Sequence, residues 1–417
     1  MFDRVNVGES CWASTAQLPT FGRLDRSLDV DLIVIGSGVT GITTAHLAKQ
    51  AGLRVALLEA DRCGSGQTGR STAHLTAVTD VPLTRLIERI GAARARAIWE
   101  AGFAAITRIR AEIRDARIHC DFAWVRGCLH APHGVPGVQA RAALAQEAAA
   151  AHTLGIDAAY VDAVPGLGGP GVWFDGQARL HPLRYVSVLL DRIDGDGSGV
   201  YESTHVDAID QVDDTVIVSA AGHRVTARYL VVATHVPLPF ARFEDDGPQP
   251  LVNVSTSYVI SGTAPAGPVD EGIYWEHRDA AYEYLRIDRT DRDGAPDLVI
   301  FGGVDHAGDE PAAPAERFAR LERRLAQRLP GVRIERRWSG TIVDSIDGRP
   351  LIGEVRPGVF VATGFGGNGM TYGTLAGMMA VDAARGVTSP WADLFDVRRQ
   401  GGLPGPWERA PDARAVC

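Results

Sequence analysis

Short apolar runs near the start of the chain predict the strands of a parallel sheet. Residues 30–35 (VDLIVI) form a β-branched and almost wholly apolar run, and residues 54–59 (RVALLE) form a second one. A parallel strand is buried on both faces and therefore shows a continuous apolar pattern, without polar alternation. The small-residue segment 42–51, which Gly52 terminates, predicts a helix between them. These segments predict a βαβ unit.

The middle of the chain carries mixed patterns. Apolar positions at helical spacing predict two helices within 83–119 and further helices at 140–154, 183–192, 313–329 and 374–385. Strands are predicted at 121–130, 199–210, 215–220, 225–234, 258–261, 282–287, 298–301 and 359–362, and a glycine loop leading into a strand at 166–174. The segments typical of nucleotide binding lie towards both ends of the chain, with material of another kind between them.

This layout predicts an α/β protein with a Rossmann-like domain made of discontinuous segments and an inserted α+β substrate lobe on a mixed sheet. We assign residues 1–80, 155–240 and 331–396 to the dinucleotide-binding domain. Residues 81–154 and 241–330 are assigned to the substrate-binding lobe, and residues 397–417 to a tail rich in Pro, Gly and Arg.

The turn after the first strand has the sequence Gly36-Ser37-Gly38-Val39-Thr40-Gly41. The first glycine permits a tight turn, the second lets the backbone approach a pyrophosphate, and the third allows close packing of helix and strand. Glu59 closes the second strand, where its carboxylate can accept hydrogen bonds from ribose hydroxyls and would repel a 2′-phosphate. The spacing predicts a dinucleotide site for NAD or FAD, not for NADP.

A second glycine loop favours FAD over NAD. Residues 364–371 (GFGGNGMT) follow a predicted strand and lead into a helix, more than three hundred residues after the first loop. Their free amides suit the pyrimidine edge of a flavin, which carries negative charge when it is reduced. Residues 64–74 (GSGQTGRSTAH) add hydroxyls and amides suited to a diphosphate and a flat ring.

Composition excludes several classes of function. Of the 417 residues, 45% are hydrophobic and 22% charged, as in ordinary globular proteins, and the net charge of −9 disfavours a nucleic-acid partner. The arginine pairs at 323–324 and 336–337 are interpreted as solvated surface. Five scattered cysteines do not form a disulfide framework, which favours the cytoplasm. No signal peptide, membrane span or metal-ligand spacing is found, so we expect no membrane and no metal site.

With these motifs the chain resembles the D-amino-acid oxidase (DAO) superfamily of FAD-dependent oxidoreductases, which includes glycine oxidase, sarcosine oxidase and γ-glutamylputrescine oxidase. The nearest pattern is the branch that often carries a C-terminal Rieske domain. The resemblance covers about residues 10–396 and rests on VDLIVIGSGVTGITTAHLAKQAGLRVALLEA, TGRSTAHL, RYLVVATH, SIDGRPLIGE, VFVATGFGGNGMTYGTLAG and WADLF.

The resemblance implies FAD as the cofactor and oxidation of a C–N bond, in which hydride passes to the flavin and the imine is hydrolysed in water. The implied FAD contacts lie in the two glycine loops, the segment after the second strand and one backbone position: Gly36, Ser37, Gly38, Thr40, Gly41, Glu59, Arg62, Arg70, Ser71, Thr72, Ala73, His74, Val206, Gly364, Gly366, Gly367, Asn368, Gly369, Met370 and Thr371.

The chain departs from this pattern at position 342. Amino-acid oxidases of the group place there an arginine that pairs with the substrate carboxylate, and this chain has Ile342. An unpaired buried carboxylate is costly, which favours a small amine as the substrate. Arg286 or Arg349 remains an alternative anchor, so an amino-acid oxidase or dehydrogenase stays open.

A second departure concerns the end of the chain. After residue 396 the sequence has Cys417 and no histidine, so we expect no Rieske cluster there. Electrons then leave to dioxygen or to a separate carrier. No cysteine lies near Trp338, so non-covalent FAD is expected. A flavin subunit of a larger electron-transfer complex is a further alternative, and an NAD dehydrogenase is disfavoured by the second glycine loop.

Three residues are candidates for catalysis: His74, Tyr284 and His306. His74 falls beside the expected flavin ring, where it either takes part in the chemistry or only closes the pocket. Tyr284 shares one strand face with Tyr282 and Arg286, which either roofs the pocket or packs on a helix. His306 and Asp305 follow a strand and a glycine pair, and a plain polar turn is the other interpretation.

Overall fold

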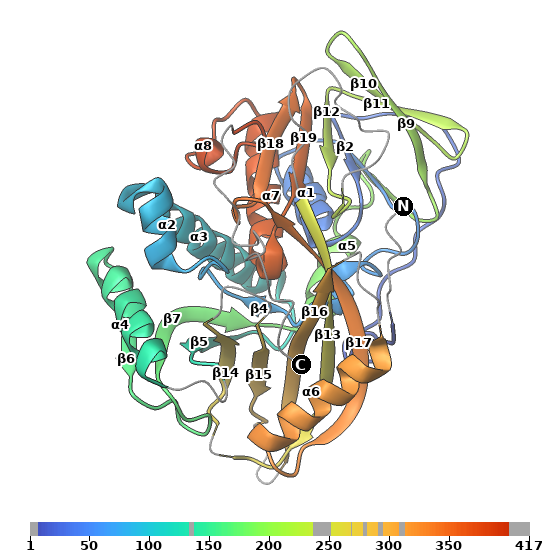
Figure 1. The fold of residues 1–417 in the computed structure, drawn as a ribbon. Helices are drawn as coiled ribbons and strands as arrows, with labels where there is room; N and C mark the ends of the chain where they lie inside the picture. Colours follow the sequence, from blue (N-terminus) through green and yellow to red (C-terminus); the bar gives the residue numbers. More distant parts are fainter. Residues whose placement is uncertain are drawn as a thin grey trace.

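The computed structural model describes residues 7–132, 137–236, 252–267, 269–277, 282–290, 295–307 and 313–399 of the chain. Within these residues the strands form sheets of six, four and nine strands, surrounded by helices (Figure 1). The six- and four-stranded sheets lie together in the upper part of Figure 1, and the nine-stranded sheet lies below them. The predicted α/β fold with a separate mixed sheet is confirmed.

The six-stranded sheet contains the predicted βαβ unit. Its order is β18-β19-β12-β2-β3-β8, and all neighbours are parallel except the edge strand β18. Helix α1 (Val39–Gln50) connects β2 to its neighbour β3. The strands are β2 (Leu32–Ile35), β3 (Val55–Leu58), β8 (Gly199–Tyr201), β12 (Tyr229–Val232), β18 (Leu351–Arg356) and β19 (Val359–Thr363).

The two faces of this sheet are covered differently, because alternate side chains of a strand point to opposite faces. On β2, Leu32 and Val34 join a core with helices α1 and α7 (Gly369–Ala384), while Ile33 and Ile35 face the small sheet. The small sheet has the order β1-β11-β10-β9. It consists of β1 (Leu28–Asp29), β9 (Val206–Val212), β10 (Thr215–Ala220) and β11 (His223–Ala227). Burial on both faces explains the continuous apolar runs in the sequence.

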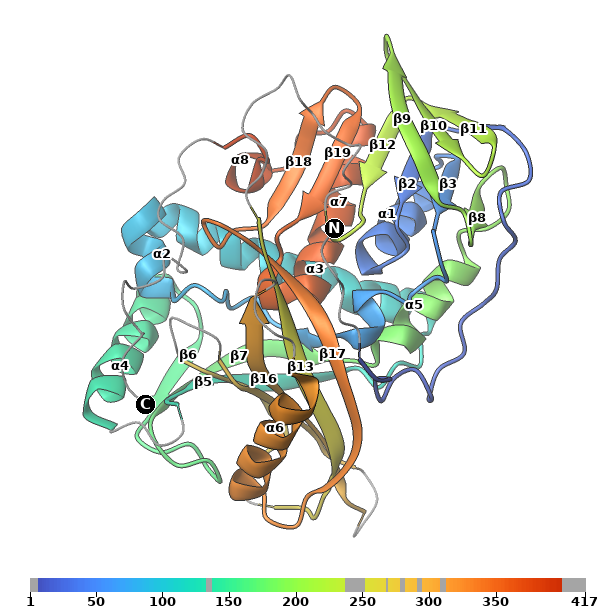
Figure 2. The ribbon, with the colours of Figure 1, turned by 45° about the vertical axis from the view of Figure 1, so that its right-hand side comes forward.

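The nine-stranded sheet is mostly antiparallel and has the order β17-β13-β16-β15-β14-β5-β7-β4, with β6 paired to β7. Helix α6 (Pro314–Arg328) packs on β13 and β16 (Figure 2). The strands are β4 (His74–Leu75), β5 (Ala123–His130), β6 (Ala158–Val161), β7 (Gly171–Arg179), β13 (Val252–Ala264), β14 (Gly272–Glu276), β15 (Tyr284–Asp288), β16 (Asp297–Ala307) and β17 (Arg333–Ser345).

One of the remaining helices links the two parts. The long helix α3 packs on α7 at one side and on β7 at the other, so it joins the nucleotide-binding layers to the large sheet. These elements are α2 (Leu83–Ile90), α3 (Ala92–Ala116), α4 (Gly137–Thr153), α5 (Pro182–Asp191), α8 (Ala392–Phe395) and the 3-10 turns η1 (Gln67–Arg70) and η2 (Gly366–Asn368).

Two of the predicted strands are each two strands in the structure. The segment 199–210 is divided into β8 and β9, and 225–234 into β11 and β12, and each pair belongs to two different sheets. Ser203 adopts a left-handed conformation (φ 48°) between β8 and β9, which turns the chain from one sheet to the next. Apolar patterning does not show this change, because both sheets share one core.

Strand pairing bears on the domain boundaries, which stay a prediction. Strands β4, β6, β7 and β17 belong to the nine-stranded sheet. Their residues were assigned to the dinucleotide-binding domain, within 1–80, 155–240 and 331–396. Sheet pairing therefore favours boundaries that give these strands to the substrate lobe.

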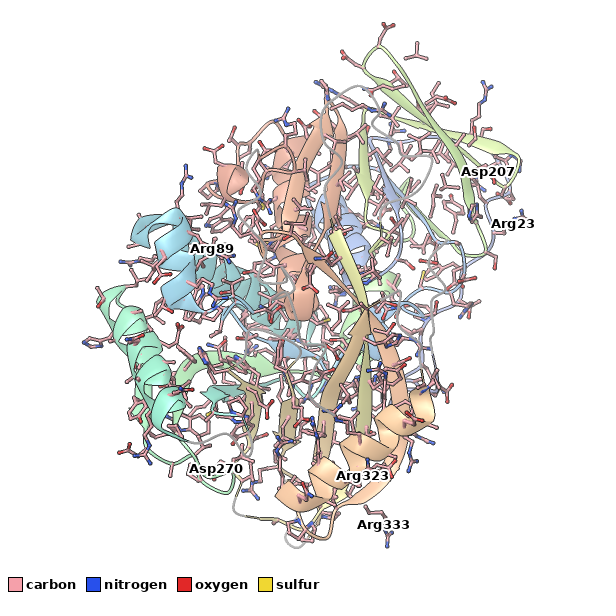
Figure 3. All side chains as sticks on the ribbon, viewed as in Figure 1. Arg23, Arg89, Asp207, Asp270, Arg323 and Arg333 are labelled. Atoms are coloured by element: carbon pink, nitrogen blue, oxygen red, sulfur yellow. The ribbon has the colours of Figure 1, made fainter. Side chains whose placement is uncertain are left out.

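The arginine pairs are at the surface. Arg323 on α6 and Arg333 at the start of β17 are exposed and project at the lower end of the molecule (Figure 3). Acidic neighbours offset this charge: Arg337 Nε lies 2.6 Å from Glu322 Oε1, and Arg324 pairs with Glu283. The surface interpretation of these arginines fits this geometry.

Candidate active site

A cavity of about 1120 Å³ lies where the six-stranded and nine-stranded sheets meet, and residues of both sheets line it. Single-ligand pockets are usually about 300–1,000 Å³, so this space can hold a dinucleotide together with a small substrate. Both glycine loops line it, at residues 36–40 and 366–370. The two loops are more than three hundred residues apart in sequence, and the fold brings them to one cavity.

The first glycine loop is shaped by close backbone contacts. Gly36 has a positive φ of 97° and packs on the Ala233 carbonyl, where a Cβ would lie 2.6 Å from the oxygen. A Cβ on Gly41 would lie 1.8 Å from the Gly36 carbonyl oxygen, so this third glycine lets α1 approach the turn. Helix α1 begins after Gly38, which provides no side-chain cap; the Val39 amide donates to Thr68 Oγ1 (2.8 Å), and the loop and first helical residues line the cavity. Such a helix end binds phosphate.

Glu59 is held beside this loop. It follows β3, and its Oε2 accepts hydrogen bonds from the Ser37 amide (2.8 Å) and the Ser37 hydroxyl (2.6 Å). Both residues line the cavity. The carboxylate thus lies next to the loop that would hold a diphosphate, in the position expected for a ribose contact.

The second glycine loop supplies another helix end. Gly364 and Gly366 have positive φ values of 72° and 56°, and α7 begins without a side-chain cap. The Gly367 amide donates to Asp80 Oδ2 (2.8 Å), and the Asn368 side chain donates to the Val78 carbonyl (2.9 Å). The N-termini of α1 and α7 therefore face the same cavity, one suited to a diphosphate and the other to the anionic edge of a flavin.

Most of the predicted FAD contacts line this cavity. They are Gly36, Ser37, Gly38, Thr40, Glu59, Arg70, Ser71, Thr72, His74, Val206, Gly366, Gly367, Asn368, Gly369 and Met370. The other five are not in the lining: Gly41, Arg62, Ala73, Gly364 and Thr371. For all twenty residues, direct contact with FAD stays a prediction.

The geometry gives these five other contacts or positions. Gly41 packs on Gly36, and Arg62 pairs with Glu202. Ala73 adopts a left-handed conformation (φ 53°) and its carbonyl accepts from Arg286. Gly364 forms the turn after β19, and Thr371 is fully buried in α7.

The three candidate catalytic residues all line the cavity. The rings of His74 and Tyr284 meet edge to face with centroids 6.1 Å apart, and the His306 ring lies 5.6 Å from that of Tyr258. Burial lowers the pKa of His74 to about 3, with a further contribution from Arg286, so its imidazole is neutral. The Tyr284 hydroxyl shares a hydrogen bond of 2.8 Å with Ser257, and burial raises its pKa. Catalytic roles for these residues stay a prediction.

Three carboxyl groups with raised pKa values line the same cavity and were not among the predicted site residues: Asp80, Asp305 and Asp344. Burial raises the pKa of Asp305 to about 7 and that of Asp344 to about 8, and it also raises the pKa of Asp80. They come from three separate segments, so no local motif joins them. One signal was present: Asp344 lies two residues after Ile342, on the same face of β17.

The arginines named as alternative carboxylate anchors have other partners. Arg286 is 1% exposed, pairs with Asp288 (Nε to Oδ1, 2.7 Å) and donates to the carbonyls of Thr72, Ala73 and Leu180. Arg349 pairs with Asp347 (2.7 Å). Neither lines the cavity.

Arg70 does line the cavity, and its Nη1 donates to backbone carbonyls, including that of Ser339 at 2.9 Å. It is the only arginine in the lining, which contains no lysine among the described residues. The cavity thus offers a substrate several carboxyl groups and one guanidinium that already has partners.

The sequence profile of the DAO family, FAD dependent oxidoreductase, matches residues 31–383. The chain belongs to this family. FAD is therefore its cofactor, and the helix ends and glycine loops around the cavity fit that group. Among the described cysteines, none lines the cavity, and attachment without a covalent bond stays a prediction.

Curated relatives support the same assignment. The chain is 28% identical over 407 residues to a putative Rieske 2Fe-2S iron-sulfur protein, YhfW, of Bacillus subtilis, covering 95% of this chain and 77% of that protein. It is 25% identical over 389 residues to γ-glutamylputrescine oxidoreductase of Escherichia coli, covering 90% and 88% of the two chains. The predicted resemblance to this family, including the Rieske-linked branch, is confirmed.

Solved structures show the same fold. Glycine oxidase from Geobacillus kaustophilus superposes with a TM-score of 0.72 at 18% identity, over 90% of this chain and 100% of that one. L-proline dehydrogenase from P. horikoshii superposes with a TM-score of 0.70 at 16% identity, over 90% and 98%. Together with the family match, the chain is an FAD-dependent oxidoreductase related to amine and amino-acid oxidases.

Two features are absent from the described residues. None of their helices is both long and apolar enough to cross a membrane. They contain no group of three or more His, Cys, Asp or Glu side chains placed to hold a metal ion. The cytoplasmic location stays a prediction.

Proposed function

We propose that this enzyme oxidises the C–N bond of a small amine that carries no α-carboxylate. Ile342 carries this proposal, because it lines the cavity at the position where amino-acid oxidases of the group have a carboxylate-binding arginine. Placing a substrate carboxylate against an isoleucine leaves that charge without a partner, which costs several kcal/mol of binding.

The charges around Ile342 support an amine. Asp344 on the same strand face, together with Asp80 and Asp305, gives this end of the cavity acidic side chains. In their ionised form these groups repel an α-carboxylate and attract an ammonium group, and a bound ammonium group in turn favours that ionised form. Arg286 and Arg349, the two alternative anchors, have partners outside the cavity.

The chain's own residues would bind, orient and desolvate the amine. FAD, when bound, supplies the hydride acceptor, and the imine product is hydrolysed in water. Neutral His74 can hydrogen-bond an amine without repelling its charge, because its buried Nε2 has no partner in the described structure. Tyr284 and Ser257 add a hydroxyl pair at the same wall. Holding the reacting carbon in place is the main contribution expected of such a site.

The test is anaerobic mixing of the FAD-loaded protein with amines and with amino acids that carry the same side chains, while the visible flavin band is followed. We expect bleaching by one or more amines and none by the matched amino acids. Bleaching by amino acids would contradict the proposal and favour an amino-acid oxidase with another anchor. An intact flavin that no compound bleaches would favour a flavin subunit of a larger complex.

The reduced enzyme then serves to identify the electron acceptor. Dioxygen and a separate carrier are both compatible with the family assignment. Admitting air to the bleached protein distinguishes them: rapid return of the flavin band indicates an oxidase, and slow return that an artificial electron-accepting dye accelerates indicates a dehydrogenase.

A further inference from the structure

Strand β16 is distorted where it reaches the cavity. Its pairing with β13 shifts register between Thr256 and Tyr258, and Gly303 and Val304 have positive φ values of 135° and 53°. A left-handed conformation is rare for a β-branched residue and costs about 1–3 kcal/mol. Such irregularities occur near active sites because they redirect side chains. The distortion at Val304 costs stability, so a role of the neighbouring residues in the cavity would explain why the sequence has it.

The result of this bulge is that consecutive residues face the cavity. In a regular strand only alternate side chains share a face, yet Asp305 and His306 both line the cavity. Without the distortion, one of the two would point into the opposite layer. Asp305 is the residue whose chemistry requires explanation, since a carboxylate placed in a desolvated cavity is unfavourable unless a ligand balances it.

Asp305 also differs from its two acidic neighbours in its contacts. The two oxygens of Asp80 accept from the Tyr282 hydroxyl (2.8 Å) and the Gly367 amide (2.8 Å). Asp344 lies against the backbone, where a Cβ on Gly366 would be 2.8 Å from its Oδ1. One oxygen of Asp305, Oδ1, is buried and accepts no hydrogen bond in the described structure, while the carboxyl group also interacts with the Ser257 hydroxyl. Arg317 donates to the carbonyl of Asp305 (3.0 Å).

We propose that the Asp305 carboxylate takes the proton that the bound ammonium group of the substrate must lose before its C–N bond is oxidised. This inference rests on the proposed function. One N–H bond breaks and one O–H bond forms, so R–CH2–NH3+ and a carboxylate become R–CH2–NH2 and a carboxylic acid, with no change in oxidation state. The neutral amine then has the free electron pair that hydride loss from its carbon requires.

The proton affinity of Asp305 suits this step. Burial raises its pKa to about 7, against the lowering effects of a hydrogen bond from Ser257 and the charge of Arg317. A general base works best when its pKa lies near the working pH. The titratable and charged groups that face it come from several elements: Asp80, Tyr282, Tyr284, His306, Arg317 and Asp344.

The size of the effect follows from the ionisation of amines. A primary amine with a pKa of about 10.4 is neutral in about one molecule per thousand at pH 7.4. An enzyme without the base can oxidise only the amine molecules that are already neutral. We therefore expect Asp305→Asn to lower the second-order rate constant of flavin reduction at pH 7.4 by about 10²–10⁴-fold. That constant should then recover about tenfold per pH unit towards pH 10.

The experiment measures anaerobic flavin reduction from pH 6 to pH 10 in the FAD-loaded wild type, Asp305→Asn and the control Asp191→Asn. Asp191 is exposed at the end of α5. Each is tested with an amine that bleaches the wild type and with a fluorinated analogue of pKa about 7. We expect Asp305→Asn to be defective with the first amine and nearly normal with the second at pH 8, because the analogue arrives already neutral. Asp191→Asn should match the wild type.

Several outcomes would overturn the inference. An unchanged pH profile in Asp305→Asn, or an equal loss with both amines at all pH values, would remove Asp305 as the proton acceptor. If Asp305→Asn does not bind FAD, Ser257→Ala decides instead. Loss of that hydrogen bond should move the acid limb of the profile to higher pH, and an unmoved limb would contradict the inference. A wild type that no amine bleaches defeats the proposed function itself, which separates the two failures.

Discussion

Replacing Gly41 by alanine should disrupt the contact on which the dinucleotide loop depends. The added Cβ would lie 1.8 Å from the Gly36 carbonyl oxygen, whereas real Cβ contacts essentially never fall below 3.0 Å. The neighbour is backbone, so no side chain can rotate away. Helix α1 and the loop must separate by about 1.2 Å, the difference between these two distances.

We expect this separation to weaken FAD binding more than it destabilises the FAD-free protein. Overpacking of a tight contact costs about 1–3 kcal/mol, and rigid backbone places Gly41 at the upper end of this range. The FAD-free protein can relieve the strain by opening the loop. The FAD-bound protein cannot, because the N-terminus of α1 must meet the diphosphate. A difference of about 3 kcal/mol corresponds to an increase of roughly 100-fold in the Kd for FAD.

The assay is titration of FAD-stripped protein with FAD, followed by quenching of flavin fluorescence. The matched control is Gly22→Ala, where an added Cβ meets no atom within 4 Å. Gly41→Ala should bind FAD about 100-fold more weakly, and Gly22→Ala should bind like the wild type. Equal affinities in the two variants would refute the steric account of this glycine and the role given to the loop.

Three further results are expected. Ile342→Arg combined with Asp344→Asn should increase the affinity for a simple carboxylate about ten- to hundredfold, because a charge-assisted hydrogen bond contributes about 1.5–3 kcal/mol. The affinity is measured by perturbation of the flavin spectrum. No gain in affinity would mean that Ile342 does not face the substrate. Arg286→Met should lower the free energy of unfolding by about 3–5 kcal/mol in denaturant titration, because it removes the donor to the buried carbonyls of Thr72, Ala73 and Leu180 and leaves Asp288 with Arg179 as its partner; a change below about 1 kcal/mol would contradict the structural role. The raised pKa values of Asp305 (about 7) and Asp344 (about 8) mean that the FAD-free protein loses stability as pH rises from about 4 towards 8, so its thermal midpoint should fall over this window. The double variant Asp305→Asn, Asp344→Asn should lose much of that fall, and an unchanged slope would argue against the burial of these groups.

The dinucleotide site could be predicted from sequence because its parts are local. The turn from Gly36 to Gly41, the strand before it and Glu59 after the next strand lie within one βαβ unit, where backbone geometry fixes spacing directly. The second glycine loop was recognisable for the same reason. Each is a short stretch whose conformation depends on its own residues and on the helix that follows.

The acidic end of the cavity was decided by the tertiary structure. Asp80, Asp305 and Asp344 come from distant segments, and each alone is typical of a surface turn. Their shared cavity depends on the packing of the nine-stranded sheet against the nucleotide-binding layers. Asp305 further depends on a bulge whose left-handed residue, Val304, is a type that sequence patterns do not associate with such turns.

Whether an arginine is available to bind a substrate carboxylate likewise depends on the tertiary structure. Position 342 showed in the sequence that the usual carboxylate partner is replaced by isoleucine. The sequence did not show that Arg286 is 1% exposed and held by Asp288 and backbone carbonyls. Local sequence therefore determined the two glycine loops that fit FAD, because each loop is built from contiguous backbone. Only the packed structure decided the charge at the acidic end of the cavity, because side chains from three separate segments create it.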